Sequence, residues 1–269
     1  MKPFLKWPGG KYRQIERICK QLGSGDRLVE PFVGSAAVFL NSNFNDYLLA
    51  DSNRDLITLY RYLQQEGVTF INYCRRLFTV KTNAKPVYYK NRERFNMTKN
   101  TRLKSALFLY LNRHGYNGLC RYNASGQFNV PFGRYDKPYF PEKEMHYFHD
   151  KARQARFIHA RFSETMQQAR PGDVVYCDPP YVPLSSTASF TDYASGGFNW
   201  NEQLELAKWA ERLSQRGCKV VISNHDIESI TNLYRTIGAD MNHFKVRRTI
   251  SCQADNRARV GELLAVFQP

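Results

Sequence analysis

The chain has 269 residues, of which 42% are apolar and 14% aromatic, and its formal net charge is +15. This length permits one large domain with or without a smaller insertion, the aromatic content argues against a disordered chain, and no apolar run approaches the ~18 residues that cross a bilayer. With no signal-peptide core and no paired cysteines, we expect a cytoplasmic protein whose excess positive charge serves an anionic partner.

The first part of the chain alternates short apolar runs with helical segments. The sequence predicts a strand over 27–32, a helix opening at 35–40, a strand over 47–51 and a helix over 53–63. This order is a βαβ pattern, which implies a parallel sheet. A mostly helical stretch follows over 68–111.

Positive charge is concentrated between residues 81 and 140. This segment has twelve Lys or Arg against two acidic residues, 12 − 2 = +10, and twelve aromatic residues. Basic groups neutralise phosphates and rings stack on bases, which suits nucleic acid, but a solvated basic face over an aromatic core explains the composition equally well. Within it, the Gly- and Asn-rich stretch 115–141 predicts a hairpin or loop.

The α/β pattern resumes in the last part of the chain. We expect a buried strand over 173–178, an amphipathic helix over 202–216, a strand over 219–223 and a final strand over 262–267. The sequence therefore predicts one α/β domain interrupted by a basic insert of about 60–100 residues.

Three motifs fall at the ends of predicted strands, where open α/β sheets bind ligands. Gly34 makes a tight turn that lets backbone approach a ligand. Asp51 lies 17 residues after Gly34 and suits ribose hydroxyls. An N-cap for the helix that begins near Asn53 is an almost equal alternative for Asp51.

The third motif, Asp178-Pro179-Pro180-Tyr181, is the most specific. Two prolines stiffen the chain and remove two N–H donors, which leaves their carbonyls free to accept hydrogen bonds. The carboxylate adds an acceptor and the tyrosine adds a flat ring. Together they form a cradle for an amino group on a planar ring.

This motif resembles the catalytic motif of amino-group DNA methyltransferases, and the order of parts resembles their alpha group. Four further segments resemble the DNA adenine methylase family: FLKWPGGK (4–11), LYLNRHGYNG (109–118), FNVPFGRY (128–135) and KVRR (245–248). The similarity extends from Phe4 to the C-terminus. It implies a Rossmann-like methyltransferase sheet with helices on both faces, plus an inserted, mainly helical target-recognition domain with a β-hairpin.

The resemblance also implies the partners and the division of the chain. S-adenosylmethionine would be the methyl donor and double-stranded DNA containing GATC the substrate, with no metal, no membrane and no obligatory protein partner. Residues 1–56 and 145–269 would form the catalytic domain, and 57–144 the DNA target-recognition domain.

Candidate site residues follow from the matched motifs. Those implied for the donor pocket are Trp7, Lys11, Phe32, Gly34, Asp51 and Asp178. Those implied for DNA binding are Lys6 and Arg121 as guanine readers, Tyr116 as a wedge, Asn117 and Leu119 in the recognition hairpin, and Arg92, Asn123 and Arg134 as phosphate contacts.

For the reaction itself we expect Asp178 and the Pro179 carbonyl to accept the two hydrogens of adenine N6. Tyr181 would stack on a base rotated out of the duplex, with Pro180 stiffening the turn. Residues 184–198, rich in Ser, Thr and Gly, suit a loop that closes over that base.

Two departures and three alternatives remain. Ala36 stands where the family has a second glycine, and we expect it inside the first helical turn, where its Cβ is harmless; Pro8 is a milder change. The same chemistry on another GAT-containing site, methylation of cytosine N4, and a catalytically silent DNA-binding protein are the competing functions.

Overall fold

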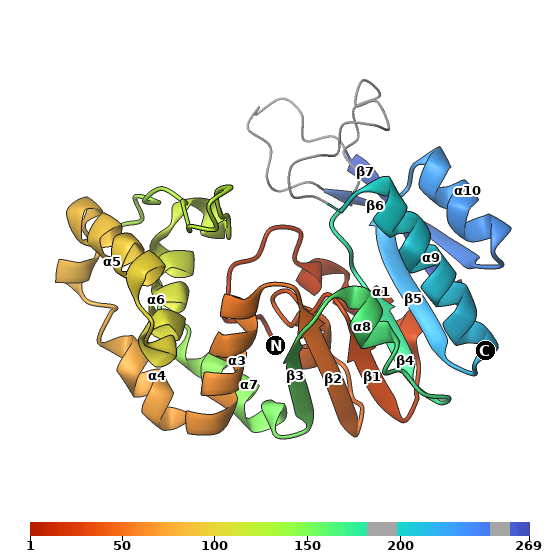
Figure 1. The fold of residues 1–269 in the computed structure, drawn as a ribbon, viewed down its shortest axis with the longest axis horizontal. Coiled ribbons are helices and arrows are strands. Elements are labelled where there is room, and N and C mark those ends of the chain that lie inside the picture. The colour runs from red at the N-terminus through yellow and green to blue at the C-terminus, as the bar shows by residue number, and fades with distance from the viewer. Residues whose placement is uncertain (182–197, 248–258) are drawn as a thin grey trace. The chain divides into compact units, whose positions relative to one another are not determined.

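The computed structural model describes residues 1–181, 198–247 and 259–269 (Figure 1). The chain packs as two compact units, of which unit 1 comprises 1–16, 33–43 and 51–159, and unit 2 comprises 17–32, 44–50 and 160–269. Within the described ranges, no helix is both long and apolar enough to cross a membrane.

Unit 1 is mainly helical. Its elements are η1 (Lys11–Gln14), α2 (Ala37–Asn41), α3 (Arg54–Glu66), α4 (Val68–Arg75), η2 (Val80–Thr82), α5 (Lys85–Met97), α6 (Thr101–His114), η3 (Tyr116–Gly118), α7 (Glu142–Ala152) and β3 (Ala155–His159).

Unit 2 carries most of the strands. Its elements are α1 (Ile15–Leu22), β1 (Arg27–Glu30), β2 (Asp46–Asp51), α8 (Phe162–Met166), β4 (Val174–Cys177), α9 (Trp200–Gln215), β5 (Lys219–His225), α10 (Glu228–Thr236), β6 (Asp240–Arg247) and β7 (Arg259–Phe267), with the ends of α1 and β2 reaching into unit 1.

The strands form a seven-stranded sheet in the order β3-β2-β1-β4-β5-β7-β6. Strands β2, β1, β4 and β5 are parallel neighbours, whereas β7 runs antiparallel to both β5 and β6. This is a doubly wound order, so the expected Rossmann-like sheet is confirmed. The final predicted strand, 262–267, is present within β7 but lies outside the parallel part.

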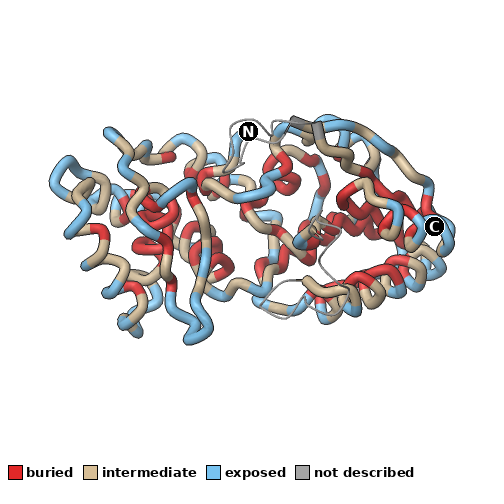
Figure 2. The backbone as a smooth tube through the Cα atoms, turned by 90° about the horizontal axis from the view of Figure 1, so that it is seen from above, coloured by how far each residue is buried: buried red, intermediate tan, exposed pale blue. Residues whose placement is uncertain are grey.

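The central strands are buried on both faces, which explains their continuous apolar runs. Every residue of β4 is buried, and so is all of β5 after its first residue. Figure 2 shows the buried residues as red stretches of the backbone tube. Helix α9 packs along β5 and hides its apolar side there.

An aromatic cluster forms the core of unit 1. Phe4 is fully buried, with its ring centroid 5.2 Å from that of Phe148 and 5.8 Å from that of Tyr60. Phe148 in turn stacks on Phe157, at 5.6 Å. Phe4 thereby anchors the N-terminal segment, so the residues that follow it start from a fixed point.

The predicted hairpin lies after α6. Tyr122 and Phe128 form an antiparallel bridge, and the Asn123 amide donates to the Gln127 carbonyl at 2.9 Å. Gly126, with φ +71°, closes the turn. The expectation of a hairpin or loop rather than a helix over 115–141 is confirmed, since the stretch has isolated bridges and one helical turn, η3.

Candidate active site and nucleic-acid interface

The direction of the sheet order reverses between β1 and β4. From β1 the order continues to β2, and from β4 it continues to β5, all four strands being parallel. Ligands of such sheets bind beyond the carboxyl ends at this reversal. Glu30 ends β1, and Asp178 directly follows β4, so the chain leaves both strands at that edge.

In unit 2, the turn after β4 holds Asp178 at the boundary between core and solvent. Asp178 is half-buried and Pro179 is buried. The Tyr181 ring meets the ring of His225, the last residue of β5, edge to face at 4.4 Å. Burial, followed by the nearby charge of Asp178, raises the pKa of Tyr181 well above its usual value. The phenol therefore remains neutral beside the carboxylate.

Phe32 lies in an aromatic cluster of the same unit. Its ring stacks on Phe162 with centroids 5.5 Å apart and meets Phe198 edge-on at 5.6 Å. The cluster is only half-buried at Phe32 and Phe198, so it supplies an apolar wall just after β1.

In unit 1, the loop around Gly34 is tied to an acid and to an indole. The Gly34 amide donates to Asp51 Oδ2 at 3.1 Å, and its carbonyl accepts from the Tyr60 hydroxyl at 2.5 Å. Gly34 has φ +45°, and a Cβ there would lie 3.0 Å from Trp7 Nε1. Only glycine fits this turn without strain.

The carboxylate of Asp51 is held by backbone amides at both oxygens. Oδ1 accepts from the Asn53 amide at 2.8 Å, while Asn53 itself caps α3 through its side chain. Burial raises the pKa of Asp51, against the opposing effect of these two amides and His159. The alternative that Asp51 is the N-cap of this helix is therefore wrong. Lys11, which opens η1, is only 6% exposed.

The expectation for Ala36 was wrong. Ala36 precedes α2, which begins at Ala37 rather than Ser35, and has the left-handed conformation φ 63°, ψ 28°. The position therefore requires φ > 0, and a Cβ there is strained by about 1–2 kcal/mol.

We predict that the strain at Ala36 separates two glycine substitutions. Ala36→Gly and Ala37→Gly each remove a buried methyl group and add the same freedom to the unfolded chain. Because only Ala36 is left-handed, Ala36→Gly should leave the protein more stable than Ala37→Gly by about 1–2 kcal/mol. Urea unfolding of the two variants measures the difference, and equal midpoints would contradict the prediction.

Lys6 is held against the loop that follows α6 by a buried amide. Asn112, 2% exposed in α6, accepts from the Lys6 amide at 2.9 Å and donates to the Lys6 carbonyl at 2.7 Å. Asn112 also donates to the Gly118 carbonyl at 3.2 Å. A Cβ on Gly118 would lie 2.1 Å from the Lys6 Cβ, so this glycine permits the close approach.

The Lys6 ammonium group lies over an aromatic ring. Its Nζ is 3.7 Å from the ring centroid of Tyr135, whose hydroxyl accepts from the Asn117 amide at 3.0 Å. Burial and the neighbouring charge of Arg113 lower the pKa of Lys6 to about 8. Lys6, Tyr135 and Asn117 thus form one cluster, although Lys6 is far from the others in sequence.

The predicted wedge, Tyr116, is 49% exposed and is not a core residue. It opens η3, in which Asn117 has φ 52°. Leu119 follows and is half-buried. Tyr116 therefore presents its ring to solvent at the start of the hairpin.

Arg121 is exposed but held in place. Its Nε donates to Asn129 Oδ1 at 2.8 Å, across the hairpin. The Asn123 carboxamide oxygen accepts from the Ser125 and Gln127 amides and so stabilises the turn. Arg134 is exposed, with φ 53°.

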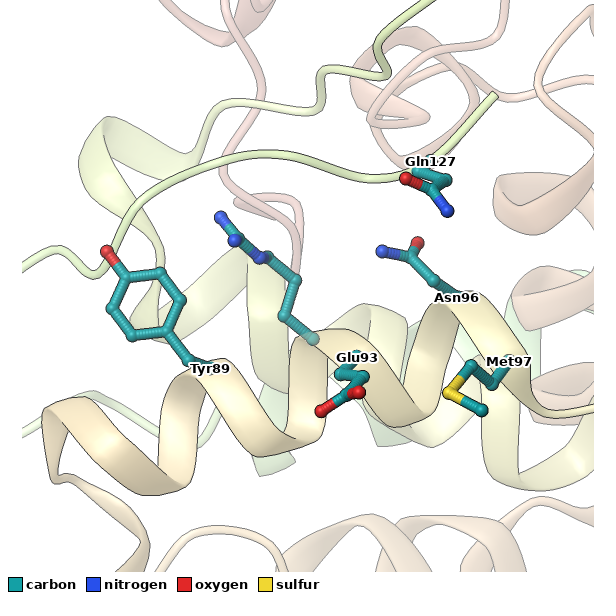
Figure 3. Close-up of a pocket in the computed structure, with 6 residues that line it drawn as sticks. Tyr89, Glu93, Asn96, Met97 and Gln127 are labelled. Atoms are coloured by element: carbon teal, nitrogen blue, oxygen red, sulfur yellow. The ribbon is translucent and has the colours of Figure 1, made fainter. Parts of the chain in front are cut away.

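Arg92 lines a groove of about 430 Å³ between α5 and the hairpin. Its guanidinium group donates to the Val130 carbonyl at 3.1 Å and lies over the Tyr89 ring at 4.7 Å. Figure 3 shows Asn96, from α5, and Gln127, from the hairpin, facing one another across this groove. The groove offers a cation, a ring and two amides, together with the Glu93 carboxylate and the Met97 side chain.

Sequence reasoning missed Asn112, Asn53 and Tyr135 as organising residues. Asn112 carried one signal, because it is a polar residue in an apolar helical run. Residues 184–197, expected to close over a base, lie outside the described residues. Within the described part of the chain, no group of three or more His, Cys, Asp or Glu residues could hold a metal ion.

Comparisons with known proteins identify the family of the chain. Residues 7–250 match the family model of D12 class N6 adenine-specific DNA methyltransferases. The chain is 50% identical over 267 residues to a DNA adenine methylase of Vibrio cholerae serotype O1, covering 99% of this chain and 96% of that protein. It is 48% identical over 266 residues to a DNA adenine methylase of Escherichia coli K12, covering 99% and 95%.

Proposed function

The chain belongs to the D12 class of N6 adenine-specific DNA methyltransferases, and we propose that its substrate is GATC in double-stranded DNA. On this proposal the target adenine is rotated out of the duplex, at a cost of a few kcal/mol, and methylated at N6. The observation that carries the proposal is the Asp178–Tyr181 turn directly after β4, at the reversal of the sheet.

The acceptor turn answers a chemical problem of adenine. The lone pair of N6 is delocalised into the ring, so the amino group is a poor nucleophile. Acceptors at its two hydrogens, the Asp178 carboxylate and the Pro179 carbonyl, favour a localised lone pair. Pro180 keeps the turn rigid and Tyr181 stacks on the base. The protein contributes positioning and electrostatics rather than a covalent step, and the methylated amine loses its proton to water.

The residues around Gly34 fit the methyl donor of the family. S-adenosylmethionine supplies, when bound, a methyl group on a cationic sulfonium. The carboxylate of Asp51 keeps further lone pairs for the two ribose hydroxyls, and Gly34 leaves the loop free of a Cβ. The ring of Trp7, beside Gly34 in unit 1, suits a cationic centre. Phe32, in unit 2, is assigned to the donor by the family resemblance alone. Lys11 completes the proposed set.

Asp51→Ala should weaken donor binding. Losing two hydroxyl contacts to a carboxylate removes interactions of about 1.5–3 kcal/mol each, so the donor Kd should rise at least about tenfold. Titration calorimetry with the donor in the absence of DNA measures this affinity. A Kd equal to that of the unmodified protein would remove Asp51 from the donor site.

Residues 57–144 serve, on this proposal, as the target-recognition domain, and 1–56 with 145–269 as the catalytic domain. Lys6 and Arg121 read guanine, Tyr116 fills the space left by the rotated base, and Asn117 and Leu119 shape the hairpin. Arg92, Asn123 and Arg134 contact phosphates, the groove beside Arg92 lying along the DNA. With DNA as its substrate, the protein would act in the cytoplasm, at the nucleoid.

The charge of Lys6 gives recognition a pH dependence. Because the pKa of Lys6 is about 8, the free enzyme loses this ammonium as pH rises through 8. kcat/KM for GATC should then fall by up to tenfold per pH unit, whereas Lys6→Arg, charged throughout, should flatten the profile. Unfolding does not explain such a fall: a Lys pKa lower in the folded protein makes stability rise with pH between 8 and 10.5. Identical profiles for both proteins would contradict the assignment.

Transfer of labelled methyl groups from the donor to DNA tests the proposal. An enzyme incorporates label, whereas a silent DNA-binding protein, which the strained Ala36 would favour, does not. Mapping at single-base resolution then distinguishes GATC from another GAT-containing site and adenine N6 from cytosine N4. Label at cytosine, or at adenines outside GATC, would overturn the proposed target.

A further inference from the structure

The N-terminal turn of α3 contacts both the candidate donor residue Asp51 and the hairpin that follows α6. Asn53 donates its backbone amide to Asp51 Oδ1 at 2.8 Å, and its side-chain oxygen accepts from the Leu56 amide at 3.1 Å. Its remaining group, Nδ2, donates to Cys120 Sγ at 3.4 Å, 67 residues away in sequence. One asparagine thus touches the candidate donor acid, the helix and the hairpin.

A second tie lies half a turn further along α3. The Tyr122 hydroxyl donates to Asp55 Oδ2 at 2.8 Å, and Lys104 Nζ lies 3.1 Å from Asp55 Oδ1. Asp55 is only 18% exposed, so this carboxylate is fixed between two partners. A hydrogen bond to a charged acceptor is among the stronger ones in proteins.

The two tied residues flank the candidate guanine reader. Side chains of an extended segment alternate between its two faces. Cys120 and Tyr122 contact α3 from one face, while Arg121, between them, is exposed and bonds Asn129 across the hairpin. Holding Cys120 and Tyr122 therefore sets the direction in which Arg121 leaves the strand.

We propose that Asn53 and Asp55 are positioning residues that fix the recognition hairpin on α3 and link it to Asp51. The inference rests on the proposed function, since it assigns the hairpin to DNA and Asp51 to the donor. When the donor binds Asp51, the hydrogen bond from the Asn53 amide transmits the change to Asn53, and the Asn53 side chain transmits it to Cys120. Such coupling is reciprocal: the factor by which the donor raises DNA affinity equals the factor by which DNA raises donor affinity.

The main test is Tyr122→Phe, with Tyr62→Phe as its matched control. Tyr62 lies on α3, and its hydroxyl bonds Thr101 Oγ1 at 2.6 Å on the exposed side. Each variant loses one hydroxyl. Tyr122→Phe loses the bond to Asp55 and the interaction with Asn53, both toward α3, whereas Tyr62→Phe loses the bond to Thr101. Two quantities are measured for each variant. The first is discrimination, the ratio of kcat/KM on the target site to kcat/KM on sites with one changed base. The second is the donor Kd with and without DNA.

We expect Tyr122→Phe to lower the discrimination at least about fivefold and to bring the effect of DNA on donor Kd close to unity. The loss should fall on KM for DNA rather than on kcat, and Tyr62→Phe should behave as the unmodified protein. Adding Asp55→Asn to Tyr122→Phe should cost less than the sum of the two single losses, because both break the Tyr122–Asp55 bond; the remainder belongs to the Asp55–Lys104 ion pair. Cys120→Ala should act in the same direction, and Cys120→Ser, which keeps an acceptor, should recover most of the loss.

Two results would overturn the inference. Unchanged discrimination and unchanged coupling in Tyr122→Phe would show that the hairpin is oriented without α3. If Tyr122→Phe instead lowered thermal stability and impaired both kcat and KM while its discrimination stayed intact, the Tyr122–Asp55 bond would be merely structural. Failure of the proposed function looks different, because the unmodified protein itself would then not methylate GATC.

Discussion

Asp178→Ala should lower the rate of methyl transfer by at least a hundredfold while leaving DNA affinity within about a factor of two. Removing one fixed group that stabilises charge developing at a reacting atom costs about 10²–10³ in kcat. Asp178 directly follows a fully buried strand and precedes two prolines, so the backbone that carries its carboxylate is fixed on both sides.

The measurement is single-turnover transfer from labelled donor, beside a DNA titration. Asp178→Asn is the matched control, since it keeps one acceptor oxygen and loses the charge; it should retain more activity than the alanine variant. Because the buried Tyr181 hydroxyl also interacts with Asp178, Tyr181→Phe shows how much of the effect depends on the ring alone. Substantial turnover by Asp178→Ala would remove the role proposed for this carboxylate.

Much of unit 2 could be predicted because its strands carry a strong signal. The strands β1, β2, β4 and β5 are buried on both faces, and burial of that kind produces short apolar runs. The strand β6 (Asp240–Arg247) was missed because its sequence, DMNHFKVR, mixes polar and apolar residues, as an edge strand does. Its partner β7 is apolar and was predicted, but its antiparallel direction leaves no mark on the composition of one strand.

Some features of the site could be predicted from short sequence segments, whereas contacts between distant residues could not. Gly34 and Asp51 were found from their spacing, which follows from the βαβ unit. The contact of Asn112 with Lys6 spans 106 residues and exists only because Phe4 is anchored in the core. Ala36 was misjudged for a different reason: alanine is the best helix former, so its neighbours read as a helix start, and a left-handed cap is invisible in such a sequence.

Arg121→Ala should reduce the preference for GATC over sites with a changed guanine by about 5- to 150-fold, which corresponds to the 1–3 kcal/mol of a bidentate arginine–guanine contact. Asn129 accepts from the Nε of Arg121 through its Oδ1 at 2.8 Å and from Nη2 through its carbonyl at 3.4 Å. Nη1 and the second hydrogen of Nη2 then remain for guanine O6 and N7. The preference is measured as the ratio of kcat/KM values on GATC and on each single-base variant.

Arg92→Ala is the control that distinguishes a contact to a base from a contact to a phosphate. The Arg92 guanidinium is fixed to the Val130 carbonyl beside an open groove and is assigned to a phosphate. Its loss should weaken binding to every sequence alike and reduce the slope of log K against log salt by about 0.9. If Arg121→Ala instead behaved in this way, losing rate with its preference intact, Arg121 would be a phosphate contact. The reading of guanine would then fall to Lys6, the second predicted guanine reader, whose Nζ lies over the Tyr135 ring.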